Sequence, residues 1–273
     1  MKKTSRIRQI PLTVLGVIFL AVMLFPVYWM VDSSFQSNVG VANATAFFPT
    51  DPTLSGYETA ISQQGGHLLT SLIVALGSTI LTVVVAAPAA YALATFKLRW
   101  AGGVLIVLLV TQMIPGIVIA NAIYTAFNDI GLLNSIAGLV LADASISIPF
   151  AILILRAFMA SFPPALVEAA RVDGAGHLRA FALIVVPISR NAIVTAALFS
   201  FLFAWSDFLF ALTLTNGTVV EPVTLGIYAY LSADIKQWGP VMATSVLASI
   251  PAVVMLTFAQ RYIAAGALGG AVK

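Results

Sequence analysis

Two acidic residues inside long apolar stretches are the side chains of this sequence best suited to bind a solute. Asp143 lies near the middle of one stretch, with Ser147 four residues later on the same helical face. Asp207 lies near the end of another, seven residues after Ser200 and close to Trp205. Carboxylates accept hydrogen bonds from hydroxyl groups, and an aromatic face such as that of Trp205 can stack on a sugar ring. This chemistry predicts a path for a hydroxylated solute.

A further polar set occupies one helical face. Its members, at positions i, i+3, i+4 and i+7, are Asn121, Tyr124, Thr125 and Asn128. Two interpretations stay open for these groups, because a polar side chain in a membrane is costly and needs a cavity or a partner. They line a solute path, or they hydrogen-bond to a neighbouring helix or a partner protein. The candidates for the path are Asp143, Asn121, Tyr124, Asn128, Trp205 and Asp207.

The sign of the charges bears on the solute. No lysine, arginine or histidine lies in the middle of an apolar stretch. A phosphorylated or carboxylated solute would meet Asp143 and Asp207 without a countercharge in this chain. The pattern therefore favours neutral sugars or polyols over anions.

The composition predicts a membrane protein. Of the 273 residues, 60% are hydrophobic and 8% are charged, whereas a soluble globular chain is about half apolar and about a quarter charged. A bilayer is therefore the expected solvent of most of this apolar surface. The sequence holds no cysteine, which excludes a disulfide framework and a thiolate metal site.

Six apolar stretches are long enough to cross a bilayer, which takes about 20 residues. They span residues 12–32, 68–96, 103–126, 133–155, 189–213 and 241–259. The prolines within them predict kinks rather than helix ends, since neighbouring helices can satisfy the freed carbonyls. The expected fold class is an all-α membrane protein with six transmembrane helices. We expect an N-terminal transmembrane helix and an extracytoplasmic loop over residues 1–66, and a core domain over residues 67–273.

The basic residues predict the orientation, because loops rich in lysine and arginine stay in the cytoplasm. Six spans place twelve of the thirteen cations on one side and leave only Lys236 on the other. The twelve are Lys2, Lys3, Arg6, Arg8, Lys97, Arg99, Arg156, Arg171, Arg179, Arg190, Arg261 and Lys273. The opposite side holds Asp51, Glu58, Asp129, Glu221 and Asp234. Both termini are therefore expected in the cytoplasm.

The first apolar stretch has an alternative interpretation. A basic start, an apolar run and the small residues Ala42 and Ala44 also suit a cleaved signal peptide. The run is longer than the roughly 7–15 residues of a signal peptide's core, which favours a retained helix. N-terminal sequencing of the mature protein distinguishes the two.

The longest cytoplasmic connection contains a predicted short helix. Pro163 and Pro164 stop the preceding helix, and alanine, leucine and Glu168 favour a new one, which Gly174 and Gly176 are expected to end. Apolar groups remain on it at Leu166, Ala169, Ala170 and Ala175. Composition alone leaves open whether lipid headgroups or a protein partner cover them.

The same segment carries a family signature. Glu168-Ala169-Ala170, then Gly174, then Ile184-x-Val186-Pro187, resembles the EAA signature of ABC importer permeases, with Val186 where leucine is usual. The resemblance implies that the loop over about residues 163–187, between the fourth and fifth spans, carries a coupling helix that inserts into a cytoplasmic ATPase subunit. The coupling residues that it implies are Glu168, Ala169, Ala170, Asp173, Gly174 and Ala175.

The resemblance covers residues 68–262. Segments such as Ala90-Tyr91-Ala92-Leu93-Ala94, Met113-Ile114-Pro115 and Ala204-Trp205-Ser206-Asp207-Phe208 are similar to the carbohydrate-uptake branch, the maltose-type second permease, although Ser206 stands where asparagine is usual. It implies a type I importer permease in a bacterial inner membrane. It also implies a second homologous permease, two ATP-binding subunits that hold ATP and Mg, and an extracytoplasmic solute-binding protein.

Several functions are not expected of this chain. There is no Gly-x-x-x-x-Gly-Lys-Ser/Thr phosphate loop and no His-Glu-x-x-His helix, so no catalysis, cofactor or metal is expected here. His67 on an outer loop and His177 are expected to be solvated surface groups, and orientation explains the cations without nucleic acid. A proton-coupled secondary transporter that uses Asp143 and Asp207 stays an alternative, although no inverted repeat supports it. A membrane scaffold without transport is a third candidate.

Overall fold

The fold is known from a computed structural model, which describes residues 6–36, 48–49, 52–96, 98–163, 165–217, 219–232 and 238–269. Within these ranges every regular element is a helix, so the predicted all-α class is confirmed. Several residues used above lie outside the described ranges, namely Lys2, Lys3, Ala42, Ala44, Asp51, Lys97, Pro164, Asp234, Lys236 and Lys273.

Four described helices are individually long and apolar enough to cross a membrane. They are α1 (Arg6–Ser34), α3 (Ser55–Thr95), α6 (Ile136–Met159) and α13 (Trp238–Gly269). Each runs through a proline without a break, as expected for helices whose freed carbonyls find other partners. Two bent helix pairs raise the number of candidate spans to as many as six.

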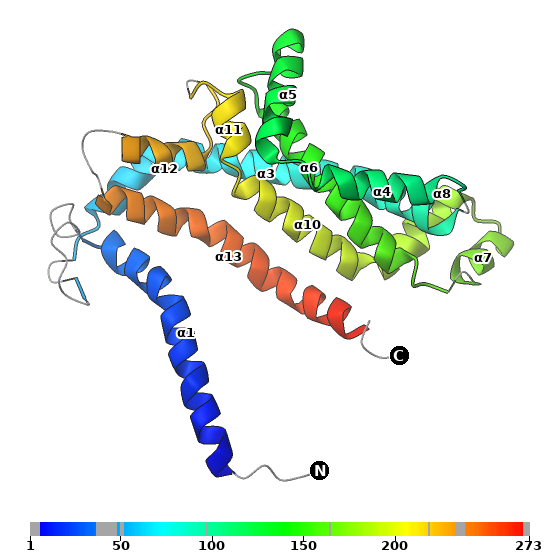
Figure 1. The fold of residues 1–273 in the computed structure, drawn as a ribbon, viewed down its shortest axis with the longest axis horizontal. Helices are drawn as coiled ribbons and strands as arrows, with labels where there is room; N and C mark the ends of the chain where they lie inside the picture. Colours follow the sequence, from blue (N-terminus) through cyan, green and yellow to red (C-terminus); the bar gives the residue numbers. More distant parts are fainter. Residues whose placement is uncertain are drawn as a thin grey trace. The chain divides into compact units, whose positions relative to one another are not determined.

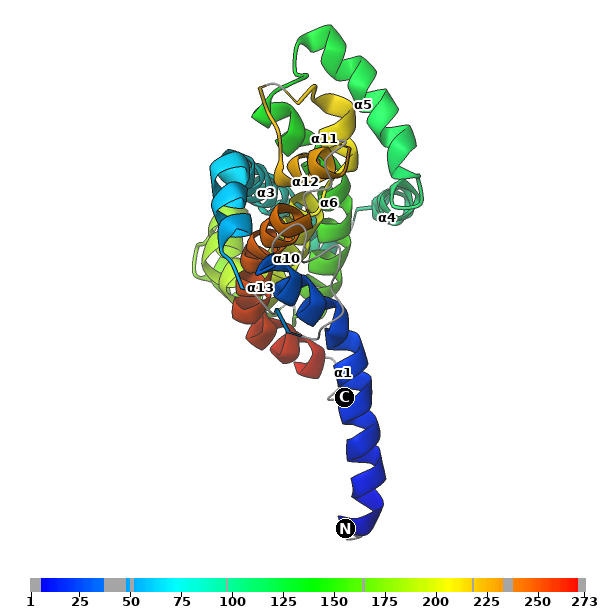
Figure 2. The ribbon, with the colours of Figure 1, turned by 90° about the vertical axis from the view of Figure 1, so that its left-hand side faces the viewer.

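The third predicted span is broken, which corrects the expectation of one helix over residues 103–126. α4 (Ala101–Thr111) and α5 (Gly116–Ile130) are bent by 99° (Figure 2). Pro115 precedes α5 with ψ 133°, an extended conformation. Proline lacks an N–H and disfavours helix in the residue before it, so the chain turns here. Pro88, Pro149 and Pro251 lie inside continuous helices, so whether a proline breaks a helix in this chain depends on its surroundings.

The fifth predicted span, over residues 189–213, is also divided. α10 (Arg190–Trp205) ends before Asp207, and α11 (Leu209–Leu214) follows. On the other side, the segment His177–Ile188 meets α10 at 79°. α3 is longer than the span predicted over residues 68–96, because it begins at Ser55. His67 therefore lies within a helix rather than on a loop, and its Nε2 is 3.5 Å from the Glu221 carboxylate.

The chain divides into two compact units. The first comprises Met1–Gly65 and Ile227–Ser249. In it, the Ser34 and Tyr57 hydroxyls lie 2.7 Å apart, and the Gln36 amide donates to the Asp32 carboxylate at 2.6 Å. It includes most of α12 (Val223–Ser232). The division into an N-terminal segment of residues 1–66 and a core domain of residues 67–273 stays a prediction.

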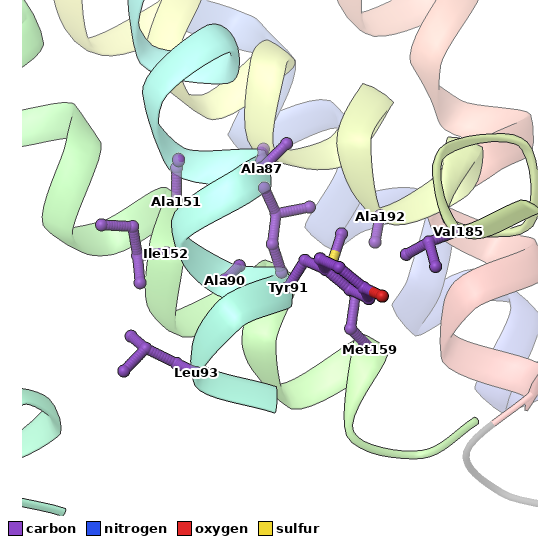
Figure 3. Packing of buried hydrophobic residues seen from close by; sticks show 12 residues of the cluster. Ala87, Ala90, Tyr91, Leu93, Ala151, Ile152, Met159, Val185 and Ala192 are labelled. Atoms are coloured by element: carbon purple, nitrogen blue, oxygen red, sulfur yellow. The ribbon is translucent and has the colours of Figure 1, made fainter. Parts of the chain in front are cut away.

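The second unit comprises Gly66–Gly226 and Ile250–Lys273 and is built on close helix packing. α6 and α10 lie side by side (Figure 1). Together with α3 they form an alanine-rich core, whose fully buried members include Ala86, Ala90, Ala151 and Ala196. Figure 3 shows Tyr91 of α3 and Met159 of α6 within this cluster. Small side chains let helix backbones approach closely, which is how helices associate in lipid.

Candidate functional site

The loop between α6 and α10 contains α7 (Ala165–Val172), a short helix that ends on a left-handed glycine. Gly174 has φ 87°, a conformation that residues with a Cβ rarely adopt. The Ala175 amide donates to the Ala170 carbonyl at 2.9 Å, and the Gly174 amide donates to the Arg171 carbonyl at 3.1 Å. This pair of bonds is the Schellman arrangement that closes a helix end. The prediction that Gly174 ends the helix is therefore confirmed.

Gly176 does not share this role, which corrects the expectation for the second glycine. Its φ is −67°, and it directly precedes α8 (His177–Ala180). Gly174 has already closed α7, so the chain is free to start the next helix at His177.

α7 exposes apolar side chains. Val172 is 88% exposed and Leu166 is 43% exposed, and Ala169 is exposed as well. Ala170 is buried and Ala175 is half-buried. An exposed apolar surface rimmed by polar residues is typical of an interaction site. The exposed apolar side chains still need a cover, either lipid headgroups or a protein partner. Ala170 corrects the expectation for one of them, because it packs within the chain.

The two acidic residues of the predicted coupling set lie near the two ends of α7. Glu168 lies in the first turn, where the helix dipole favours a negative charge. Asp173 follows the last turn, and its amide donates to the Ala169 carbonyl at 3.0 Å. Both side chains are exposed and accessible to a partner.

Aromatic contacts join the segment after α7 to the end of α3. The rings of Tyr91 and Phe181 have centroids 5.2 Å apart. The ring of Phe96 stands edge-on to the ring of His177, with centroids 5.2 Å apart. His177 is therefore exposed, as predicted, but it also packs against an aromatic ring. Sequence reasoning missed these supports, although Tyr91 lay in a segment used for the family resemblance. An aromatic residue at the end of an apolar stretch was the available signal.

A cavity of about 470 Å³ lies between α7 and the ends of α3 and α6. Its lining includes Tyr91, Phe96, Met159, Val167, Glu168 and His177. α7 also touches the core beside this cavity, because Val167 packs against the alanine-rich cluster. The chain then continues through η1 (Phe181–Val185), a π-helix, and α9 (Val186–Ile188), which contain the Ile184-x-Val186-Pro187 part of the signature.

Two of the path candidates are buried. Asp143 is 5% exposed on α6 and Trp205 is 7% exposed on α10, where its ring stacks on Phe201. Ser147 and Ser200 are each 1% exposed, on the same two helices. Trp205 belongs to an apolar cluster with Ala75 of α3, against which Met255 of α13 packs. These four side chains are therefore buried on α6 and α10, and for Trp205 the covering helices include α3 and α13.

Asp207 has a structural task. Its carboxylate accepts hydrogen bonds from the Phe210 amide at 3.2 Å and the Ala211 amide at 2.9 Å, which caps the start of α11. Its carbonyl accepts a bond from the Thr224 hydroxyl at 2.7 Å. These bonds favour the structural interpretation, and a contact with the solute stays a prediction.

The polar face of α5 is exposed. Asn121, Tyr124 and Asn128 all present accessible side chains. The neighbouring Ala120 is fully buried and packs with Leu139 of α6 in an apolar cluster. α5 therefore has one packed face and one open face. The candidates on its open face are accessible, whereas Asp143 and Trp205 are buried.

The sequence relatives decide the family. Residues 83–268 match the binding-protein-dependent transport system inner membrane component family. This chain belongs to that family. The permease is 34% identical over 274 residues to the probable ABC transporter permease protein y4oR of Sinorhizobium fredii, with 99% of this chain and 98% of that protein covered.

Two other relatives carry substrate names. The permease is 30% identical to the diacetylchitobiose uptake system permease protein DasC of Streptomyces coelicolor, over 95% of each chain. It is 32% identical to the trehalose transport system permease protein SugB of Mycobacterium tuberculosis, over 95% of this chain and 96% of that protein.

The fold of the permease matches a solved structure. A chain of a bacterial ABC transporter involved in the import of the acidic polysaccharide alginate superposes with a TM-score of 0.80. The match covers 96% of the permease and 98% of that chain at 22% identity, and it identifies the fold of an ABC importer permease.

Proposed function

We propose that this permease forms half of the translocation path of an ATP-driven importer of neutral sugars or polyols. The observation that carries the proposal is α7, with its exposed apolar side chains and its left-handed end at Gly174, placed in the loop that bears the EAA signature. A second homologous permease supplies the other half of the path.

α7 is proposed to seat in a cytoplasmic ATPase subunit. Two such subunits bind ATP and Mg, and their closure moves α7 and so switches the path between its inward and outward openings. Each ligand then favours one conformation, which is what couples hydrolysis to transport. The exposure of Val172 and Leu166 supports this role, because a protein partner removes their apolar surface from water.

The orientation follows from the charges. We propose that α7 and both termini lie in the cytoplasm, because a six-span arrangement puts twelve of the thirteen cations on that side. An extracytoplasmic binding protein then delivers the solute from the opposite side.

The solute class rests on two supports. Relatives that match at 30% and 32% identity are named for diacetylchitobiose and trehalose. The apolar stretches carry no cation at mid-depth, as a neutral solute allows. The alginate importer shares the fold at 22% identity, so its acidic substrate does not bear on this chain.

The proposed contacts with the solute lie first on the open face of α5, since Asn121, Tyr124 and Asn128 are accessible there. Asp143 is reached only if the helices that cover it move apart, because it is 5% exposed. An Asp143→Asn variant with unchanged substrate affinity and normal ATPase activity removes Asp143 from the path.

Crosslinking tests the seating of α7. The chain has no cysteine, so Val172→Cys introduces a single thiol at an exposed position. A thiol-to-amine crosslinker applied to the whole transporter is expected to join this position to the ATPase subunit. Val219→Cys is the matched control, because Val219 is 78% exposed and lies between α11 and α12. A fully assembled transporter that gives no adduct at position 172, or equal adducts at both positions, contradicts the proposal.

The alternative of a proton-coupled carrier makes a different prediction. Uptake by such a carrier survives depletion of ATP and collapses with the proton gradient. The proposed importer behaves in the opposite way in the same two measurements.

A further inference from the structure

A cavity of about 340 Å³ lies where α10 begins and α13 nears its end. Its lining consists of Arg190, Asn191, Arg261 and Tyr262, all in the second unit. The lining is rich in hydrogen-bond donors, which come from two guanidinium groups, an amide and a phenol. None of the lining residues is a carboxylate. This set of side chains suits an anion.

The two arginines lack an acidic partner within the described part of the chain, where the single acid–base contact joins His67 and Glu221. Arg261 is nevertheless held in place. Its Nη2 donates to the Tyr262 hydroxyl at 3.0 Å, and its guanidinium carbon lies 4.8 Å from the centre of that ring. Two positive charges that share a cavity repel each other, and a bound anion relieves that repulsion.

The helix that starts at this cavity adds to the attraction. α10 has 16 residues and begins at Arg190, so the positive end of its dipole faces the cavity. The preceding residue, Ser189, provides no side-chain cap to α10. Helix starts of this kind bind phosphate and other anions.

The surroundings indicate which anion occupies the cavity. Arg261 and Tyr262 follow the apolar run of α13, and arginine and tyrosine side chains gather where membrane helices meet the lipid headgroups, so the cavity is expected at headgroup level. Val254, Phe258 and Arg261 fall at positions i, i+4 and i+7 and share one helix face. Phe258 is 67% exposed and Val254 is 44% exposed. A ligand that reaches from the arginines onto this face therefore carries both a phosphate and an acyl chain.

We propose that the cavity lined by Arg190 and Arg261 binds the phosphate of an anionic phospholipid, whose acyl chain lies along Val254 and Phe258. Arginine suits this task because its planar fork donates two parallel hydrogen bonds to phosphate oxygens. The lipid bridges the ends of α10 and α13 and stabilises their packing. The site depends on the membrane and not on the solute, so its test is independent of the proposed transport function.

A lipid titration of the purified transporter tests the site. Phosphatidylglycerol is added in detergent, and the apparent affinity is read from the rise of the thermal-unfolding midpoint. The Arg190→Gln/Arg261→Gln variant is expected to bind about 30-fold more weakly, at about 1 kcal/mol for each basic residue near a lipid surface and 1.4 kcal/mol for a factor of ten. The Arg99→Gln/Arg179→Gln variant is the control, because it removes two exposed cations outside the cavity.

Two further arms identify the ligand. Phosphatidylcholine with the same acyl chains is expected to leave the midpoint unchanged, and so is inorganic phosphate at the same concentration. Should the Gln variant fail to assemble, the Arg190→Lys/Arg261→Lys variant keeps both charges without the planar fork and is expected to bind several-fold more weakly than the native protein.

Three results overturn the proposal. The first is an affinity for phosphatidylglycerol that is the same in the native protein and in the Arg190→Gln/Arg261→Gln variant. If only the Arg190→Lys/Arg261→Lys variant assembles, equal affinity in that variant has the same meaning. The second is an equal loss of affinity in the Arg99/Arg179 control. The third is inorganic phosphate that raises the midpoint as much as the lipid does, which identifies a site for a soluble phosphate group instead.

Discussion

The Ala175 amide donates its hydrogen bond to the Ala170 carbonyl across the left-handed turn at Gly174, over 2.9 Å. This bond fixes the direction in which the chain leaves α7. The exposed apolar residues of α7 are therefore presented at a defined angle to the segment that leads into α10. If α7 couples hydrolysis to transport, as we propose, a stiff turn is needed at Gly174.

Gly174→Ala is expected to weaken coupling. A Cβ at this position meets no atom within 4 Å, but the φ of 87° costs a residue with a side chain about 1–2 kcal/mol. The turn then populates its native form about 10-fold less relative to open forms. We expect a several-fold loss of uptake per ATP hydrolysed, with normal assembly, measured in proteoliposomes.

Gly176→Ala is the matched control for that variant. A Cβ at Gly176 also meets no atom within 4 Å, and the φ there is −67°. Uptake per ATP should equal that of the native protein. Equal coupling in both variants would show that the left-handed turn has no mechanical role.

Asp207→Ala is expected to destabilise the protein without changing its affinity for the solute. Removal of the carboxylate leaves the Phe210 and Ala211 amides without their cap, which costs about 1 kcal/mol. Thermal unfolding and the KM of uptake measure the two effects. Asp207→Ser keeps a capping oxygen and should recover most of the stability, whereas a raised KM in both variants assigns Asp207 to the solute path.

Asn121→Ala and Asn128→Ala are expected to raise the KM of uptake. Both side chains are exposed on one face of α5, so their loss removes hydrogen bonds to a passing hydroxylated solute, at about 0.5–1.5 kcal/mol each. The thermal-unfolding midpoint should stay constant. Asp129→Asn serves as the control, because Asp129 is exposed on the same helix outside this face. An unchanged KM in both asparagine variants excludes this face from the path.

Gly138→Ala is expected to disrupt the start of α6. A Cβ there would collide with the Leu132 carbonyl, a backbone atom that cannot rotate away. Overpacking of this kind costs about 1–3 kcal/mol or more. Thermal unfolding of the purified protein measures the loss. Gly102→Ala on α4 meets no atom within 4 Å and should leave the midpoint unchanged or raised; equal stability of the two variants argues against the tight turn at residue 132.

Sequence patterns predicted what depends on local chemistry. Apolar length predicted the long helices, because a membrane helix needs about 20 apolar residues whatever its neighbours are. The run from Glu168 to Gly174 predicted a short helix closed by a glycine, since a left-handed end selects glycine. The same residues carried the family signature, which the match over residues 83–268 bears out.

Only the tertiary structure decided which prolines interrupt a helix and which polar residues are accessible. Pro88 and Pro149 lie inside continuous helices, whereas Pro115 stands at a 99° bend. Asp143 is buried on α6, while Asn121 is open on α5. The reason is physical: the cost of a freed carbonyl or a buried carboxylate depends on the groups that other helices bring beside it, and one stretch of sequence does not contain those groups.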